Sequence, residues 1–87
     1  MTLSIVIPVL NEVESIEAAL QALAPLRYRG CEVIVIDGGS DDGTIERASA
    51  LATRVLSAAR GRASQMNAGA AAAKGDVLDR SPPPEAR

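Results

Sequence analysis

The chain has 87 residues, which allows one small domain with a thin core, because a chain of this size buries only about 60 to 65 per cent of its unfolded surface. Its net charge is −2, and its nine Lys and Arg residues are scattered from residue 27 onward, which excludes a basic patch for nucleic acid or a polybasic membrane anchor. It has one cysteine, Cys31, and no histidine, so disulfide frameworks, Cys/His zinc sites and imidazole bases are excluded within it.

The longest apolar stretches, residues 5–10 and 33–36, are far shorter than the ~20 residues that cross a bilayer. No transmembrane helix is therefore predicted. The first residues carry neither a positive segment nor a small-residue cleavage site, which predicts a cytoplasmic location. Cys31 is expected to pack as a small hydrophobe at the start of a strand.

The first expected elements are a strand and a helix. A continuous run rich in β-branched residues at 3–9 predicts the strand. Asn11 follows as an expected helix N-cap, with Glu14 at the third helical position of a capping box. Apolar residues then recur at helical spacing, at positions 13, 16, 20 and 23, and the helix is expected to end near Ala24 because Pro25 disfavours its continuation.

A second strand is predicted at residues 33–36, which are wholly apolar and therefore typical of a strand covered on both faces. It ends at Asp37 and a glycine-rich acidic loop, after which Asp41 or Asp42 is expected to cap a second helix from Thr44 to about Ala52. Residues 55–56 predict a short third strand, residues 60–73 a third helix, and residues 76–78 the start of a fourth strand.

This order predicts an α/β fold in residues 1–78, with a parallel Rossmann-like βαβαβαβ sheet and right-handed crossovers. Residues 79–87 contain three consecutive prolines and no apolar period, which predicts an extended, disordered tail. Because the apolar pattern stops inside a strand that should be buried, we expect that a frameshift or a premature end has interrupted the fold.

The strongest candidate site residue is Asp37, at the carboxyl end of the buried strand, where ligands bind in parallel α/β sheets. It either satisfies loop amides or accepts N–H groups of a base or ring. Gly38, Gly39 and Gly43 either permit positive φ angles or let the backbone approach a ligand.

Other polar residues also have two interpretations. Asp41 and Asp42 are better explained as helix caps than as metal ligands, whereas Asn11 and Glu12 divide between a cap and a site at the end of the first strand. Three residues at the start of the third expected helix either form an ordinary solvated helix start or contact an anion. They are Arg60, Arg62 and Gln65. The second interpretation arises because cations are disfavoured at a helix N-terminus.

Common nucleotide-binding motifs are missing. The loop after the first strand contains no glycine, which disfavours the G-x-G-x-x-G site of NAD and FAD enzymes. There is no G-x-x-x-x-G-K-S/T, which excludes an ATP or GTP P-loop, and the acidic loop follows the second strand rather than the first as in phospho-receiver domains. The interpretation that is left is a nucleotide site made of side chains and loop backbone.

Four segments together resemble the N-terminal part of family 2 glycosyltransferases: residues 4–12, 32–44, 60–69 and 74–76. The Asp-Gly-Gly-Ser sequence at 37–40 and the Arg-Gly-Arg-Ala-x-Gln-Met-Asn-x-Gly run at 60–69 are similar to the branch of arsenosugar-biosynthesis glycosyltransferases. The resemblance extends in register from residue 3 to residue 78.

The resemblance implies the first half of a GT-A fold, which binds a nucleotide-diphosphosugar such as a UDP- or GDP-sugar. It places Pro8, Asn11 and Glu12 around the base and ribose. It brings Asp37 to the base, and it places Gly39, Arg62 and Asn67 near the nucleotide.

The sequence departs from the family pattern after the fourth strand. The resemblance implies a D-x-D-like motif that holds Mg²⁺ or Mn²⁺ against the diphosphate, and Asp-Arg-Ser at residues 79–81 is not that motif. The acceptor half and its general base are also missing. The sequence therefore predicts a donor-binding half with no catalytic residue and no metal ligand of its own, inactive alone. The alternatives are a non-catalytic nucleotide-binding or interaction module and a truncated product that does not fold stably.

Overall fold

The computed structural model describes residues 3–79, in which seven elements alternate along the chain. They are β1 (Leu3–Val9), α1 (Ile16–Tyr28), β2 (Glu32–Asp37), α2 (Thr44–Ser49), β3 (Arg54–Ser57), α3 (Arg62–Ala72) and β4 (Asp76–Asp79). The four strands form one parallel sheet in the order β3-β2-β1-β4, which confirms the predicted α/β fold. The predicted disordered tail begins at Asp79, but the structure places Asp79 in β4; residues 80–87 lie outside the described residues.

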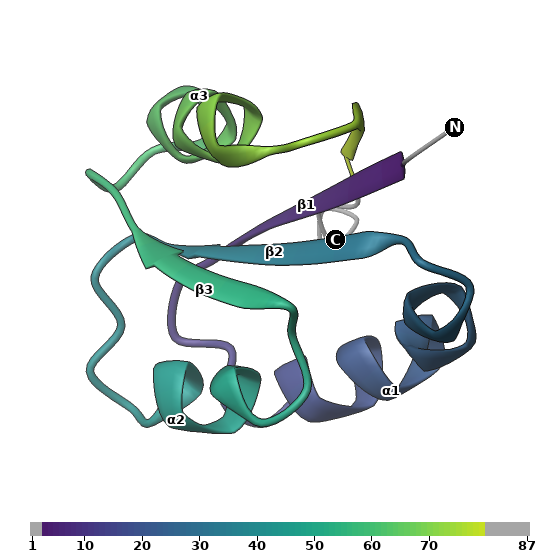
Figure 1. The fold of residues 1–87 in the computed structure, drawn as a ribbon. Coiled ribbons are helices and arrows are strands. Elements are labelled where there is room, and N and C mark those ends of the chain that lie inside the picture. Colours follow the sequence, from purple (N-terminus) through teal and green to yellow (C-terminus); the bar gives the residue numbers. More distant parts are fainter. Residues whose placement is uncertain (1–2, 80–87) are drawn as a thin grey trace, which may run out of the picture.

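Helices cover both faces of the sheet, with α3 on one face and α1 and α2 on the other (Figure 1). Side chains of the central strands alternate between these faces, because successive residues of a strand point to opposite sides. The cluster against α1 and α2 takes Ile5, Ile7, Val9, Val33 and Val35 from the sheet. The cluster against α3 takes Val6, Ile34 and Ile36. The absence of polar alternation in these strands therefore follows from the two covered faces. In the described part of the chain, no helix is both long and apolar enough to cross a membrane.

The first helix begins later than predicted, at Ile16, and the capping box on Asn11 is wrong. Asn11 has a left-handed backbone (φ 51°), and its Oδ1 accepts a hydrogen bond from the N–H of Asp41 rather than from Glu14. The carbonyl of Glu12 accepts the N–H groups of Ser15 and Ile16, which forms a turn before α1. A long-range bond between two loops has taken the side chain that local spacing assigned to a cap.

The predicted end of this helix at Ala24 is also wrong, because α1 continues through Pro25 to Tyr28. Proline removes one N–H from the helix ladder. Leu23 before it is buried, and Leu26 after it packs against the same core cluster, so apolar burial offsets the lost bond. The second helix is shorter than predicted and ends at Ser49, and Cys31 packs against the core as expected.

The third helix approaches the sheet closely at Gly69. A Cβ atom added to Gly69 would lie 2.3 Å from Cγ1 of Val6 and 3.2 Å from Cγ1 of Ile36. Side chains of β1 and β2 fill this space, so the helix packs there through its backbone. Gly69 therefore sets the distance between α3 and the sheet.

A buried carboxylate ties the amino end of the sheet to the connection between α3 and β4. Glu32 accepts hydrogen bonds from Ser4 Oγ (2.9 Å), from the Lys74 N–H (3.1 Å) and from the Arg54 guanidinium (2.9 Å). Ser4 Oγ in turn accepts the N–H of Gly75 (3.1 Å). Burial raises the pKa of Glu32, but the bonds from Lys74, Ser4 and Arg54 and the charge of Arg54 outweigh it, so the pKa lies below its ordinary value.

We expect Gly69→Ala to destabilise the fold. Helix propensity alone predicts a gain of about 1 kcal/mol from this change. The overlap with Val6 predicts instead a loss of about 1 to 3 kcal/mol, because filled space must rearrange. Urea unfolding of wild type and Gly69→Ala measures whether stability rises or falls. A stabilised variant would contradict the packing described for α3.

We expect Glu32 to make the fold weaker in acid. A carboxyl whose pKa is lowered by folding contributes stability above its unfolded value, near 4.5, and this contribution is lost as the pH falls through the folded pKa. In Glu32→Gln, the free energy of unfolding should fall less steeply below pH 5, by at most about 1.4 kcal/mol per pH unit. Glu14→Gln, which removes an exposed carboxylate from the loop at the opposite, carboxyl end of the sheet, is the control. Equal slopes for wild type and Glu32→Gln would contradict the assignment.

Candidate functional site

Two loops meet at the carboxyl ends of β1 and β2, residues 10–15 and 38–43, and hydrogen bonds join them directly. The N–H of Asn11 donates to Ser40 Oγ (2.7 Å), and the N–H of Asp41 donates back to Asn11 Oδ1 (3.0 Å). Asn also tolerates the left-handed backbone better than most residues. Asn11 therefore fixes one loop against the other.

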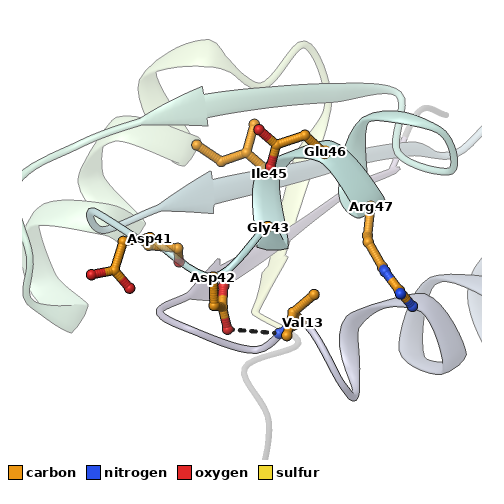
Figure 2. A pocket seen from close by; sticks show the side chains of 8 residues that line it. Val13, Asp41, Asp42, Gly43, Ile45, Glu46 and Arg47 are labelled. Atoms are coloured by element: carbon orange, nitrogen blue, oxygen red, sulfur yellow. Dashed lines mark hydrogen bonds between the residues drawn. The ribbon is translucent and has the colours of Figure 1, made fainter.

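A second pair of bonds lies one step further along both loops. The N–H of Glu12 donates to Thr44 Oγ1 (2.9 Å), and the N–H of Val13 donates to Asp42 Oδ2 (3.3 Å; Figure 2). The N-cap residue of α2 is Gly43, with a left-handed backbone (φ 93°), and not Asp41 or Asp42 as predicted. Asp42 Oδ1 nevertheless accepts the N–H of Thr44, the first residue of α2 (3.1 Å). The Thr44 hydroxyl lowers the pKa of Asp42, burial acts against it, and the backbone N–H groups of Val13 and Thr44 lower it further.

The carboxylate of Asp37 lies at the end of β2 with its side chain buried. Its Oδ2 accepts the N–H groups of Gly39 (2.9 Å) and Ser40 (2.8 Å), which fixes the turn of the loop. Its Oδ1 is buried and has no hydrogen-bond partner. The interpretation of Asp37 as a loop acid is therefore correct for one oxygen, and the interpretation as a ligand-binding acid stays open for the other.

The start of α3 reaches the same strand ends through Gln65. Its Nε2 donates to the carbonyls of Val9 (3.0 Å) and Ile36 (2.8 Å), and its Oε1 accepts the N–H of Gly61 (3.2 Å). Gln65 is only 5% exposed, so neither a solvated helix start nor an anion contact describes this residue. The spacing of Gln65 and Gly69, four residues apart on one helix face, was the signal that this face packs on the sheet.

The predicted nucleotide-binding residues do not all line one hollow. A hollow of about 310 Å³ is lined by Asp42 and residues 11–15, which include Asn11 and Glu12. A second, of about 450 Å³, is lined by Val13 and residues 40–43 and 45–47 (Figure 2). Asp37 ends β2, Gly39 lies in the loop that follows, and the Gly39 N–H donates to Asp37 Oδ2.

Three predicted residues lie away from both hollows. Pro8 is half-buried in β1, opposite Ile36 in the strand register. Arg62 is the first residue of α3, and Asn67 follows in its second turn, both with exposed side chains. The β3–α3 connection brings Arg62 to the same end of the sheet as Asp37, because the N–H of Ala58 donates to the Asp37 carbonyl (2.9 Å).

A divalent metal does not fit the described residues. Within residues 3–79, no group of three or more Asp, Glu or Cys side chains is placed to hold a metal ion. At the carboxyl ends of β1 and β2, the Asp42 carboxylate is engaged with Val13 and Thr44, and Oδ2 of Asp37 is engaged with its loop. We therefore assign no step to a metal held by these residues alone.

Comparison with known proteins identifies the family. The model for "Glycosyl transferase family 2" matches residues 4–78. The chain belongs to this family. As a family 2 chain, it shows the residue pattern of the N-terminal segment, in agreement with the resemblance of its motifs. The branch within the family stays a prediction.

Curated members of the family share this segment. Succinoglycan biosynthesis protein ExoA of Rhizobium meliloti is 52% identical over 50 residues, which are 56% of this chain and 15% of that protein. Glucosyl-3-phosphoglycerate synthase of Mycobacterium tuberculosis is 45% identical over 58 residues, or 64% of this chain and 18% of that protein. The family 2 chain described here thus matches less than a fifth of these relatives.

A solved structure of the Mycobacterium tuberculosis glucosyl-3-phosphoglycerate synthase shares the fold. It matches with a TM-score of 0.78 and 34% identity over 90% of this chain and 32% of the other. That structure is described as a complex with Mn²⁺, uridine diphosphate and phosphoglyceric acid. The GT-A likeness expected from the sequence is confirmed, and a divalent metal with UDP occurs in the relative.

Proposed function

We propose that this chain forms the donor-nucleotide half of a family 2 glycosyltransferase, the site in which UDP of a UDP-sugar binds. The observation that carries the proposal is the buried, unpartnered Oδ1 of Asp37 at the carboxyl end of a central parallel strand. Buried polar atoms in folded proteins nearly always have a partner, so this exception requires an explanation, and a ligand that donates to the oxygen provides one. The carboxyl ends of the strands are also where ligands bind in parallel α/β folds.

The chemistry of Asp37 suits a nucleobase. A carboxylate oxygen only accepts hydrogen bonds, and the uracil ring carries one N–H donor that such an oxygen can receive. The N–H groups of Gly39 and Ser40 already bind Oδ2 of Asp37, so the direction in which Oδ1 points is fixed. We favour UDP over GDP because the similar solved structures contain UDP.

A ligand must displace part of the loop to reach this oxygen, since Asp37 is only 1% exposed. The loop is suited to such a movement: Gly39 is exposed, with φ 107°, and a Cβ there would meet nothing within 4 Å. Asn11 and Glu12 border the adjoining hollow and would face the ribose. Pro8 would line the base pocket from β1.

The start of α3 would face the diphosphate. Its first turn contains no acidic residue and begins with Arg62, a combination that favours an anion over a cation. Asn67 would lie on the same side in the second turn. Sugar transfer itself is proposed for the family member as a whole, and residues 3–79 alone are expected to bind nucleotide without turning it over. The cytoplasmic location remains a prediction.

We predict that Asp37→Asn weakens UDP binding by about 12- to 150-fold, the effect of losing a hydrogen bond to a charged group of 1.5 to 3 kcal/mol. The amide can still accept the loop N–H groups, but it places a donor where the ligand needs an acceptor. Calorimetric titration of UDP into both proteins, in a chelator, measures the effect.

Asp41→Asn is the matched control, because it removes the same charge from an exposed position of the same loop. It should leave the affinity for UDP unchanged. Equal affinities of wild type and Asp37→Asn would contradict the proposal. A folded chain with no affinity for UDP would instead favour a non-catalytic interaction module.

We also predict that Mg²⁺ or Mn²⁺ improves the affinity for UDP by less than about tenfold, because the described residues offer no set of metal ligands. Titration of UDP with and without each ion tests this. A larger gain would show that Asp41 or Asp42 supplies ligands that the structure shows in other roles.

A further inference from the structure

Gln65 occupies an unusual position for a polar side chain, between two parallel strands at the point where their ladder ends. Its amide hydrogens reach the carbonyl of Val9, the last residue of β1, and the carbonyl of Ile36 in β2. Its oxygen accepts the N–H of Gly61 immediately before α3. One amide therefore joins β1, β2 and α3.

These contacts lie on the backbone next to Asp37, both in its own strand and in the neighbouring strand. Ile36 precedes Asp37, and Val9 is its partner in the strand register. Gly38, which follows Asp37, donates its N–H to the same Val9 carbonyl (3.0 Å). Any displacement of the Gln65 amide would therefore shift the backbone that carries the Asp37 carboxylate.

Gly38 shows how tightly the amide is held. A Cβ atom at Gly38 would lie 2.9 Å from Oε1 and 3.0 Å from Cδ of Gln65. This glycine provides the space that the glutamine side chain occupies, rather than a left-handed backbone, which the structure records at Gly39 and Gly43 instead. The loop and the helix are thus matched at this contact.

We propose that Gln65 is a positioning residue for the nucleotide site, which sets the Asp37 carboxylate in relation to the Arg62 end of α3. It does so through the strand ends and not by contact with the ligand. The proposal rests on the proposed function for its ligand, UDP, but its geometric part concerns this chain alone. Its test therefore includes one readout without ligand.

The test uses Gln65→Met, which keeps the length of the side chain but removes all three hydrogen bonds. Gln21→Met makes the same change at an exposed position of α1 and is the matched control. We expect Gln65→Met, at a temperature where circular dichroism shows it folded, to weaken UDP binding by about three- to tenfold. We also expect the NMR amide signals of Gly39 and Ser40, which bond Asp37, to shift without ligand. The control should change neither.

A double variant separates positioning from stability. If Gln65 acts through Asp37, Asp37→Asn combined with Gln65→Met should weaken UDP binding by less than the product of the single effects. If Gln65→Met lowers only the melting temperature and moves neither the affinity nor the two amide signals, the residue is merely structural and the proposal is overturned.

Two further outcomes are decided by the same measurements. If the wild-type chain does not bind UDP, the proposed function fails, and the ligand-free amide signals alone support or overturn positioning. If Gln65→Met does not fold, Gly38→Ala replaces it, because the added Cβ pushes the flexible amide from its place and leaves Gln65 intact. The same shifts at Gly39 and Ser40 are then expected, and their absence overturns the proposal.

Discussion

The burial of one carboxylate at the end of a central strand constrains the loops at the carboxyl end of the whole sheet. Asp37 fixes the following turn through Oδ2 and keeps Oδ1 without a partner. Leaving a buried polar atom unpaired costs free energy, so the surrounding loops must hold it in place. The bonds of Asn11 with the acidic loop and of Gln65 with the strand ends supply that support. Fold and candidate site are therefore built by the same contacts.

The two ends of the sheet are organised differently. At the amino end, Glu32 collects donors from Ser4, Lys74 and Arg54, and all of its bonds are internal. At the carboxyl end, Asp37 satisfies only half of its capacity. In parallel sheets with both faces covered, ligands bind beyond the carboxyl ends of the strands, and this contrast supports the proposal that the carboxyl end binds the nucleotide.

Much of the fold could be predicted because the apolar runs at residues 5–10 and 33–36 are uninterrupted, and Asp37 stands out as the abrupt end of the second run. The role of Asn11 could not be predicted, because local spacing indicated a helix cap whereas its hydrogen-bond partner, Asp41, is thirty residues away. Pro25 misled for a similar reason, because packing of the flanking leucines outweighs local preference. Gln65 was hidden by its polarity, and only its placement in line with Gly69 indicated a buried face.

A crystal structure of this chain grown with UDP tests the central claim most directly. The account predicts electron density for uracil at the carboxyl end of β2, with a ring N–H donating to Asp37 Oδ1 at about 2.7 to 3.2 Å between heavy atoms. Nucleotide bound instead in the hollow lined by residues 40–43 and 45–47, with Asp37 Oδ1 still unpartnered, would contradict it.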